Sequence, residues 1–292
     1  PLRAQDHSWW NEKHDWDGVT HWKDYLIFSS GFMGPNALPV PDINRGEFSD
    51  KFELELGLQQ HSGKGDKTLN FLSDLIIPVS PGKAGIKIHY IPVEFYETDT
   101  LTRDLRKAHE YDTKGYSYGD VYFTTYIQAI KDHPKLPDLL FTINLKTTSG
   151  TNMGSARHTD APGYYFDASL AKTFQTGSKY LESWRPYFMG GFYCYQTNRH
   201  DYEQNDAFLF GIGFLTSTAL LQIDNQLGGY IGYIRNGDQP VVYRLTFLSK
   251  YKSALNYKVG FQFGIHDVPF NSLTVSGVLK FEDLKMFRKE SE

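Results

Sequence analysis

The stretch "NYKVGFQFGIHD", residues 256–267, carries an apolar side chain at every second position from Tyr257 to Ile265. A period of two predicts a β-strand, because successive side chains of a strand point to opposite faces of the sheet. The same alternation recurs from residue 50 onward in about twelve segments, most of them ten or more residues long. The chain is therefore constrained to a large antiparallel sheet, whose apolar face must meet either a protein core or lipid.

Three features favour lipid on the apolar side. Strands of roughly 9–11 residues suit a tilted membrane crossing, whereas strands of globular proteins average about 5–6 residues. The opposite face is rich in Gly, Tyr and Gln rather than in the Lys and Glu of a water-washed surface. Many of the 20 Tyr and 21 Phe cluster near strand ends, as the aromatic girdles of a membrane barrel require.

These patterns predict an all-β fold, a transmembrane up-and-down antiparallel β-barrel of about 12 strands. The segment "DYLIFSSGFM", residues 24–33, is an additional strand candidate, and one more would make a barrel of 14. The alternative is a soluble sandwich of two stacked sheets, in which the apolar face would form the core. No stretch approaches the ~18 consecutive apolar residues of a membrane-spanning helix.

Over residues 50–285 the chain resembles the outer-membrane β-barrel proteins of Gram-negative bacteria, in particular uncharacterised porin-like barrels. The resemblance implies a location in the bacterial outer membrane, in contact with its lipid. The chain departs from that family at its end, because it runs past Phe281 to "KESE" instead of stopping at an aromatic residue. We expect residues 1–49 to form a Trp-rich N-terminal segment acting as a plug or a periplasmic contact, and residues 286–292 to form a tail.

The connections between strands fall into two classes. Those at 97–115 and 149–162 are long, whereas most of the alternate ones are tight turns, which predicts long loops on an extracellular rim and both termini on the periplasmic rim. Within the first long loop, "TRDLRKAHEY" predicts one or two turns of helix. The alternation slips at Tyr90 and Ile91 beside Pro92, which predicts a β-bulge.

Inward-facing charges of both signs nearly balance, which favours ion pairs across the lumen over a strongly selective pore. Among these charges are Glu53, Glu55, Asp74 and Lys280. The residues expected to line the lumen are Lys87, Asp120, Asn144, Lys146, Asp167, Asp224, Gln226, Arg244, Lys258 and Gln262.

Two further groups of polar residues are candidate sites. Arg157, His158 and Asp160, in the second long loop, are expected to contact a ligand or to clasp one another. In the N-terminal segment, which holds four of the five Trp, three His residues recur at intervals of seven. Metal ligands usually lie closer together, so we expect no metal and no cofactor, and a segment that packs in the barrel or docks on a partner.

An enzymatic role finds little support. In "QQHSGKG", His61 and Ser62 are similar to the His and Ser that outer-membrane phospholipases use, but neighbours on one strand point to opposite faces. The single cysteine, Cys194, shares the parity of apolar neighbours and is expected to be buried or to face lipid. A net charge of −4 gives no reason to expect nucleic acid as a partner.

Three functions follow as hypotheses. The first is a non-enzymatic barrel subunit of an outer-membrane assembly, which contacts other outer-membrane or periplasmic proteins through the N-terminal segment and loops. The second is a porin-like channel for small polar solutes, and the third is a lipid-modifying enzyme. Paired lumen charges and abundant lumen Tyr favour the first.

Overall fold

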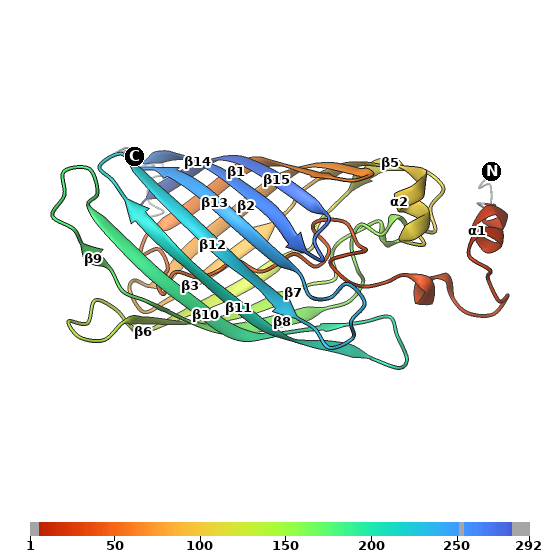
Figure 1. Ribbon diagram of the computed structural model, residues 1–292, viewed down its shortest axis with the longest axis horizontal. Helices are drawn as coiled ribbons and strands as arrows, with labels where there is room; N and C mark the ends of the chain where they lie inside the picture. Colours follow the sequence, from red (N-terminus) through yellow and green to blue (C-terminus); the bar gives the residue numbers. More distant parts are fainter. Residues whose placement is uncertain (1–5, 251–253, 282–292) are drawn as a thin grey trace, which may run out of the picture.

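The computed structural model describes residues 6–250 and 254–281, and within them twelve strands form a closed antiparallel barrel (Figure 1). The barrel closes because β1 (Phe52–Gly63) pairs with both β2 (Asp66–Ser80) and β15 (Phe270–Phe281). Between them the wall continues through β3 (Ala84–Tyr90), β6 (Tyr122–Ile130), β7 (Asp138–Lys146), β8 (Gly163–Ala171), β10 (Ser183–Gln196), β11 (Gln204–Ser217), β12 (Leu221–Ile231), β13 (Val241–Ser249) and β14 (Leu255–His266). The prediction of an all-β barrel of 12 strands is confirmed.

Three short strands complete the wall. β4 (Glu94–Thr98) pairs with β2 beyond the point where β3 ends, and β5 (Lys114–Ser117) pairs with β4 in turn. The interruption at residues 91–93 coincides with the slip in the alternation, and Pro92 has no N–H to contribute to a ladder. β9 (Phe174–Gln175) pairs with the first residues of β10, so it extends the wall at one rim.

The strand β7 shows which face meets which environment. Its outward side chains Phe141, Ile143 and Leu145 are 43%, 48% and 55% exposed, whereas the alternating Thr142, Asn144 and Lys146 are buried. The same division runs around the barrel, with apolar side chains outside and polar ones inside. The soluble sandwich with an apolar core is therefore wrong, because the apolar face is the outer surface.

The two rims of the barrel differ. One rim, here called the loop end, carries α2 (Thr100–Leu105) and the 3-10 turn η2 (Met153–Ser155), and its two long loops meet where the His109 N–H donates to the Gly154 carbonyl at 2.6 Å. The opposite rim, the turn end, holds the connections β2–β3, β6–β7, β11–β12 and β13–β14, and the last residue of β15. The short helix expected in the first loop is present, although it begins at Thr100.

The N-terminal segment also begins at the loop end (Figure 1). The helix α1 (Ser8–Lys13) lies against the first long loop, where the Trp10 indole N–H donates to the Lys107 carbonyl at 3.1 Å. A short 3-10 turn, η1 (Trp22–Tyr25), follows. Within the described residues the chain begins at the loop end and its last strand, β15, ends at the turn end, contrary to the expectation that the two ends share one rim.

Residues 26–48, here called the lumen segment, run through the barrel from the loop end to the turn end. Their apolar side chains are buried among the inward faces of the strands; they are Leu26, Phe28, Met33, Ala37, Leu38, Val40, Ile43 and Phe48. The stretch 24–33 is not a strand, so the alternative of 14 strands is wrong.

The tail expected at 286–292 lies outside the described residues. In the part of the chain described, no helix is long and apolar enough to cross a membrane.

Candidate functional site

The lumen segment is fitted to the wall by glycines. Gly211 of β11 and Gly228 of β12 are paired across the two strands and face inward. A Cβ added at Gly211 would lie 2.6 Å from Cγ2 of Ile43, and one at Gly228 would also collide with the Ile43 side chain. The two glycines thus form a notch that admits Ile43, which makes this contact specific in shape.

Side chains from several strands hold the backbone of the segment. Arg244 of β13 donates from Nη2 and Nη1 to the Val40 and Pro41 carbonyls at 2.6 and 2.9 Å. Gln128 of β6 donates to the Gly46 carbonyl at 2.8 Å. Because these bonds reach backbone oxygens, they satisfy polar groups that an irregular buried chain would otherwise leave unpaired.

Charged and amide side chains of the segment pair with the wall as well. Asp42 forms an ion pair with Lys87 at 2.8 Å, and Arg45 forms one with Asp224 at 2.8 Å. The Asn44 amide donates to Thr142 Oγ1 at 3.0 Å and to Asp167 Oδ1 at 3.1 Å. Among the residues expected to line the lumen, Lys87, Asp167, Asp224, Gln226 and Arg244 contact the lumen segment.

Beside the last part of the segment, in the turn-end half of the lumen, lies a polar cavity of about 520 Å³ that residues 42–48 help to line. Its wall carries the ion pairs Glu53–Lys280 and Glu55–Lys258, with N···O distances of 2.6 and 2.8 Å. Gln262 also faces it, accepting a hydrogen bond from Arg244 Nε at 2.8 Å. The cavity is lined by both signs of charge, already paired with each other.

The loop end of the lumen is closed by a buried ion-pair cluster. Arg157, from the second long loop, pairs through Nε with Glu94 at 2.7 Å and through Nη1 with Asp66 at 2.8 Å. Arg106 pairs with the same Asp66 carboxylate at 2.6 Å, and the Asn36 amide of the lumen segment donates to Glu94 at 2.5 Å. Both Arg157 and Glu94 are 0% exposed, so their charges are held out of contact with solvent.

A second polar group lies beside this cluster. Lys146 pairs with Asp120 at 2.8 Å and donates to the Ala161 carbonyl at 2.9 Å, while the Asn144 amide donates to Thr124 at 2.5 Å. His158 is fully buried, with its ring nitrogens 3.9 Å from the Glu94 and Asp120 carboxylates. Neither nitrogen has a hydrogen-bond partner within the described residues. Burial lowers the pKa of His158.

The three loop residues Arg157, His158 and Asp160 therefore do not clasp one another. Arg157 and His158 point into the lumen, whereas Asp160 is exposed and pairs with Lys23 at 2.7 Å. Sequence reasoning could not find these partners, because Glu94 and Asp66 lie 63 and 91 residues from Arg157 along the chain.

His61 has a partner that sequence reasoning also missed. Its Nδ1 lies 2.7 Å from Ser272 Oγ, and its Nε2 lies 3.0 Å from Asn70 Oδ1, whereas Ser62 is exposed on the outer face. A hydroxyl, an imidazole and an amide follow one another as in a catalytic triad, but the two ring nitrogens are exchanged, because a triad serine bonds to Nε2. However, His61 and Ser272 are 3% and 7% exposed inside the packed lumen. Only the register of β1 against β15, which sets His61 opposite Ser272, could have revealed the pair.

The N-terminal aromatic residues pack on the first long loop. The His109 ring is stacked on His7, with centroids 3.8 Å apart, and on Trp22, with centroids 4.7 Å apart. Burial lowers the pKa of His109 from its usual 6.5 to about 4.

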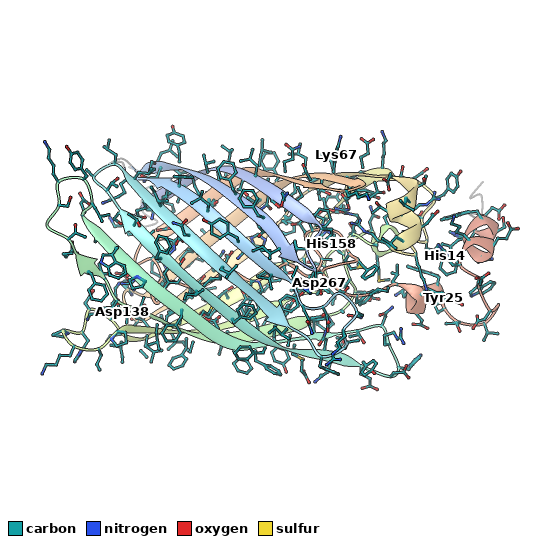
Figure 2. The ribbon with its side chains drawn as sticks, in the orientation of Figure 1. His14, Tyr25, Lys67, Asp138, His158 and Asp267 are labelled. Carbon is teal, nitrogen blue, oxygen red and sulfur yellow. The ribbon has the colours of Figure 1, made fainter. Side chains whose placement is uncertain are left out.

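The N-terminal segment projects from the barrel. Figure 2 shows His14 and Tyr25 on this projecting part, away from the barrel, and His158 within the outline of the barrel. Within residues 6–250 and 254–281, no group of three or more His, Cys, Asp or Glu side chains could hold a metal ion.

Large apolar side chains are exposed at the loop end. Leu101 and Leu105 of α2 are 70% and 62% exposed, Tyr111 in the same loop is 64% exposed, and Val19 of the N-terminal segment is 88% exposed. Exposed apolar side chains of this size are candidates for a contact surface.

The fold is similar to that of known outer-membrane proteins. An outer-membrane channel from Pseudomonas putida F1 superposes with a TM-score of 0.58 at 11% identity, over 82% of this chain and 98% of that one. The transport unit of an autotransporter from Escherichia coli gives a TM-score of 0.48 at 12% identity, over 85% and 95% of the two chains. A KdgM porin gives 0.45 at 9% identity, over 79% and 99%. No protein-family model and no curated protein sequence matches the chain. The chain therefore has the fold of the bacterial outer-membrane β-barrels.

Proposed function

We propose that this protein is a non-enzymatic outer-membrane barrel, closed by its own lumen segment, that serves as a subunit of an outer-membrane assembly. The observation that carries the proposal is the occupied lumen. The segment contacts inward side chains of β3, β6, β7, β8, β12 and β13, and the cluster around Arg157 seals the loop end. A barrel filled in this way offers its rim, rather than its interior, for interaction.

The proposed contact surface comprises the exposed apolar side chains Val19, Leu101, Leu105 and Tyr111 at the loop end. Extraction in mild detergent should give a complex larger than the monomer on a native gel. The double variant Leu101→Asp, Leu105→Asp should return the chain to monomer size, because charges cannot be buried in an apolar contact without a partner. Lys64→Asp, also at the loop end, is the matched control and should leave the complex intact. A parent protein that migrates as a monomer would contradict the assembly role.

A gated channel is the second candidate, favoured by the polar cavity of about 520 Å³ at the turn end. The two candidates differ in whether the lumen segment ever moves. In a Cys194→Ser background, Asn44→Cys with Thr142→Cys would pin the segment to β7, since the two native side chains lie 3.0 Å apart. If the barrel is permanently closed, this variant should show no conductance in planar bilayers, whether the two cysteines are reduced or oxidised. Conductance that appears only after reduction would favour the channel.

The non-enzymatic part of the proposal has its own test. Ser272 and His61 are buried, so a fluorophosphonate probe, which labels activated serines, should not label the folded protein. Labelling that disappears in Ser272→Ala, while the barrel remains folded, would assign a hydrolytic activity instead.

A further inference from the structure

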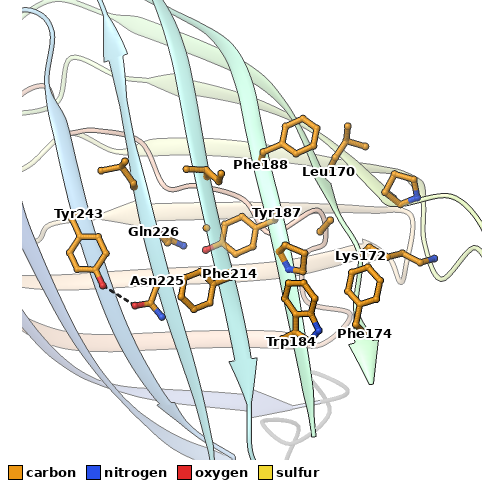
Figure 3. Close-up of a pocket in the computed structure, with 16 residues that line it drawn as sticks. Leu170, Lys172, Phe174, Trp184, Tyr187, Phe188, Phe214, Asn225, Gln226 and Tyr243 are labelled. Carbon is orange, nitrogen blue, oxygen red and sulfur yellow. Dashed lines mark hydrogen bonds between the residues drawn. The ribbon is translucent and has the colours of Figure 1, made fainter. Parts of the chain in front are cut away.

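A groove of about 800 Å³ lies on the outer face of the barrel, towards the turn end (Figure 3). That volume is in the range of roughly 300–1,000 Å³ typical of small-molecule sites. Most of its outward-facing lining is apolar and comes from neighbouring strands: Leu170 of β8, Trp184 and Phe188 of β10, Ile212 and Phe214 of β11, and Leu227 of β12. The exception is Asn225, whose side-chain oxygen accepts a hydrogen bond from the Tyr243 hydroxyl at 2.8 Å. The groove is therefore a concave part of the surface that faces lipid.

The walls of the groove are fixed by packing within the protein. Phe174 of β9 stacks on Trp184 with ring centroids 5.0 Å apart, and β9 is held to β10 by strand pairing. Gly213 also lines the groove, but only through its backbone, because a Cβ at this position would point into the lumen, 2.5 Å from the Tyr187 ring. An aliphatic chain lying here would be in contact on several sides, and each contact adds dispersion energy that a flat wall cannot give.

A positive charge lies at one edge of the groove. Lys172 directly follows the last residue of β8, which places it at the turn-end rim, and Figure 3 shows its side chain extending away from the aromatic rings. Its ammonium group donates to the His133 and Leu136 carbonyls at 2.5 and 2.9 Å. Carbonyl dipoles do not neutralise a full charge, and Lys172 forms no ion pair within the described residues.

We propose that this groove binds a glycerophospholipid with an anionic headgroup. An acyl chain would lie along Trp184, Phe188 and Phe214, and the headgroup would sit beside Lys172 at the level of the rim. A general electrostatic attraction does not explain such a preference, because the chain carries a net charge of −4. The site is independent of whether the lumen is open or closed.

The chain contains its own reporter for the test. Trp184 is the only tryptophan that lies outside the N-terminal segment. The protein is reconstituted in phosphatidylcholine vesicles containing brominated phosphatidylglycerol or brominated phosphatidylcholine, and the signal of Trp184 is the difference between the parent and Trp184→Phe. One lysine near a membrane surface contributes about 1 kcal/mol, so brominated phosphatidylglycerol should bind about fivefold more tightly.

Variants separate the headgroup site from ordinary solvation by lipid. Lys172→Gln should abolish the preference, Lys172→Arg should keep it, and Lys179→Gln, in the adjacent connection but not in the groove, should leave it unchanged. High salt provides a second test that needs no variant. About 1 M salt shortens the Debye length to about 3 Å, so it should weaken the preference for brominated phosphatidylglycerol. Equal quenching by the two lipids in the parent, or a preference that persists in Lys172→Gln, would overturn the proposal.

Discussion

At the residue scale, the side chains that fill the lumen owe their positions to partners far away in the chain. The parity of each strand predicts that Lys87, Lys146 or Arg244 points inward, because alternate side chains face opposite sides. It does not predict that Arg244 binds backbone carbonyls of residues 40 and 41, or that His61 meets Ser272. Such pairs depend on strand register and on the path of an irregular segment, neither of which is local.

Replacing Arg157 tests the buried cluster. Arg157→Gln leaves Glu94 and Asp66 buried with less compensating charge, and breaking a buried ion pair by removing one partner costs about 3–5 kcal/mol. The folded form, followed by its faster migration on unheated SDS gels, should be lost at lower temperature than in the parent. Asp160→Asn, in the same loop, removes an exposed pair and should cost less than about 1 kcal/mol. Equal effects of the two variants would mean that the cluster does not stabilise the barrel.

Acid should loosen the N-terminal aromatic cluster through His109. Its pKa is lowered from 6.5 to about 4 in the folded state, so folding releases a proton that the unfolded segment holds below pH 6.5. The contribution of the His109 ring to the stability of the folded segment is therefore fully present above pH 6.5 and decreases as the pH falls towards 4. Tryptophan fluorescence, which reports the stacking of Trp22, should change across this interval. His109→Phe keeps a stacked ring without a titrating group, so an unchanged transition in that variant would assign it to other groups.

At the element scale, the period of two was sufficient to predict the wall, but near Pro92 it predicted a β-bulge where the structure has a break between β3 and β4. The lumen segment was beyond such reasoning. Residues 26–48 have no regular period, and their apolar side chains are equally compatible with a strand, a plug or a surface contact. What decides between these is the shape of the interior, for example the notch that Gly211 and Gly228 leave for Ile43.

The two faces of β14 can be compared at neighbouring residues. Phe261 points outward, where we expect lipid, so Phe261→Arg should destabilise the barrel by about 2–4 kcal/mol, whereas Phe261→Leu should have little effect. Gln262 points to the lumen, where it is paired with Arg244 across the strands. Gln262→Glu should therefore fold as well as the parent, because the new charge meets the guanidinium. Urea unfolding in lipid vesicles measures all three, and equal losses for Phe261→Arg and Gln262→Glu would contradict the assignment of the faces.

At the scale of the whole molecule, the path of the chain decides how the barrel is inserted. The alternation of loop lengths predicted which connections share a rim, and the two long loops do meet. It gave no information about the N-terminal segment, whose start was expected beside the other terminus. The lumen segment runs through the barrel, and its path places α1 at the loop end. That path is determined by the buried contacts of residues 26–48, which no sequence pattern predicts.

Labelling on whole cells tests that path and the orientation together. In a Cys194→Ser background, Lys64→Cys and Glu12→Cys lie exposed at the loop end, outside the proposed contact surface, whereas Lys179→Cys lies exposed at the turn end. If the long loops are extracellular, an impermeant maleimide should label positions 64 and 12 and spare 179. Labelling at 179 alone would invert the insertion while keeping the fold. Labelling at 64 without 12 would contradict the threaded path itself, because a segment that runs through the lumen must bring residue 12 out on the side of the long loops.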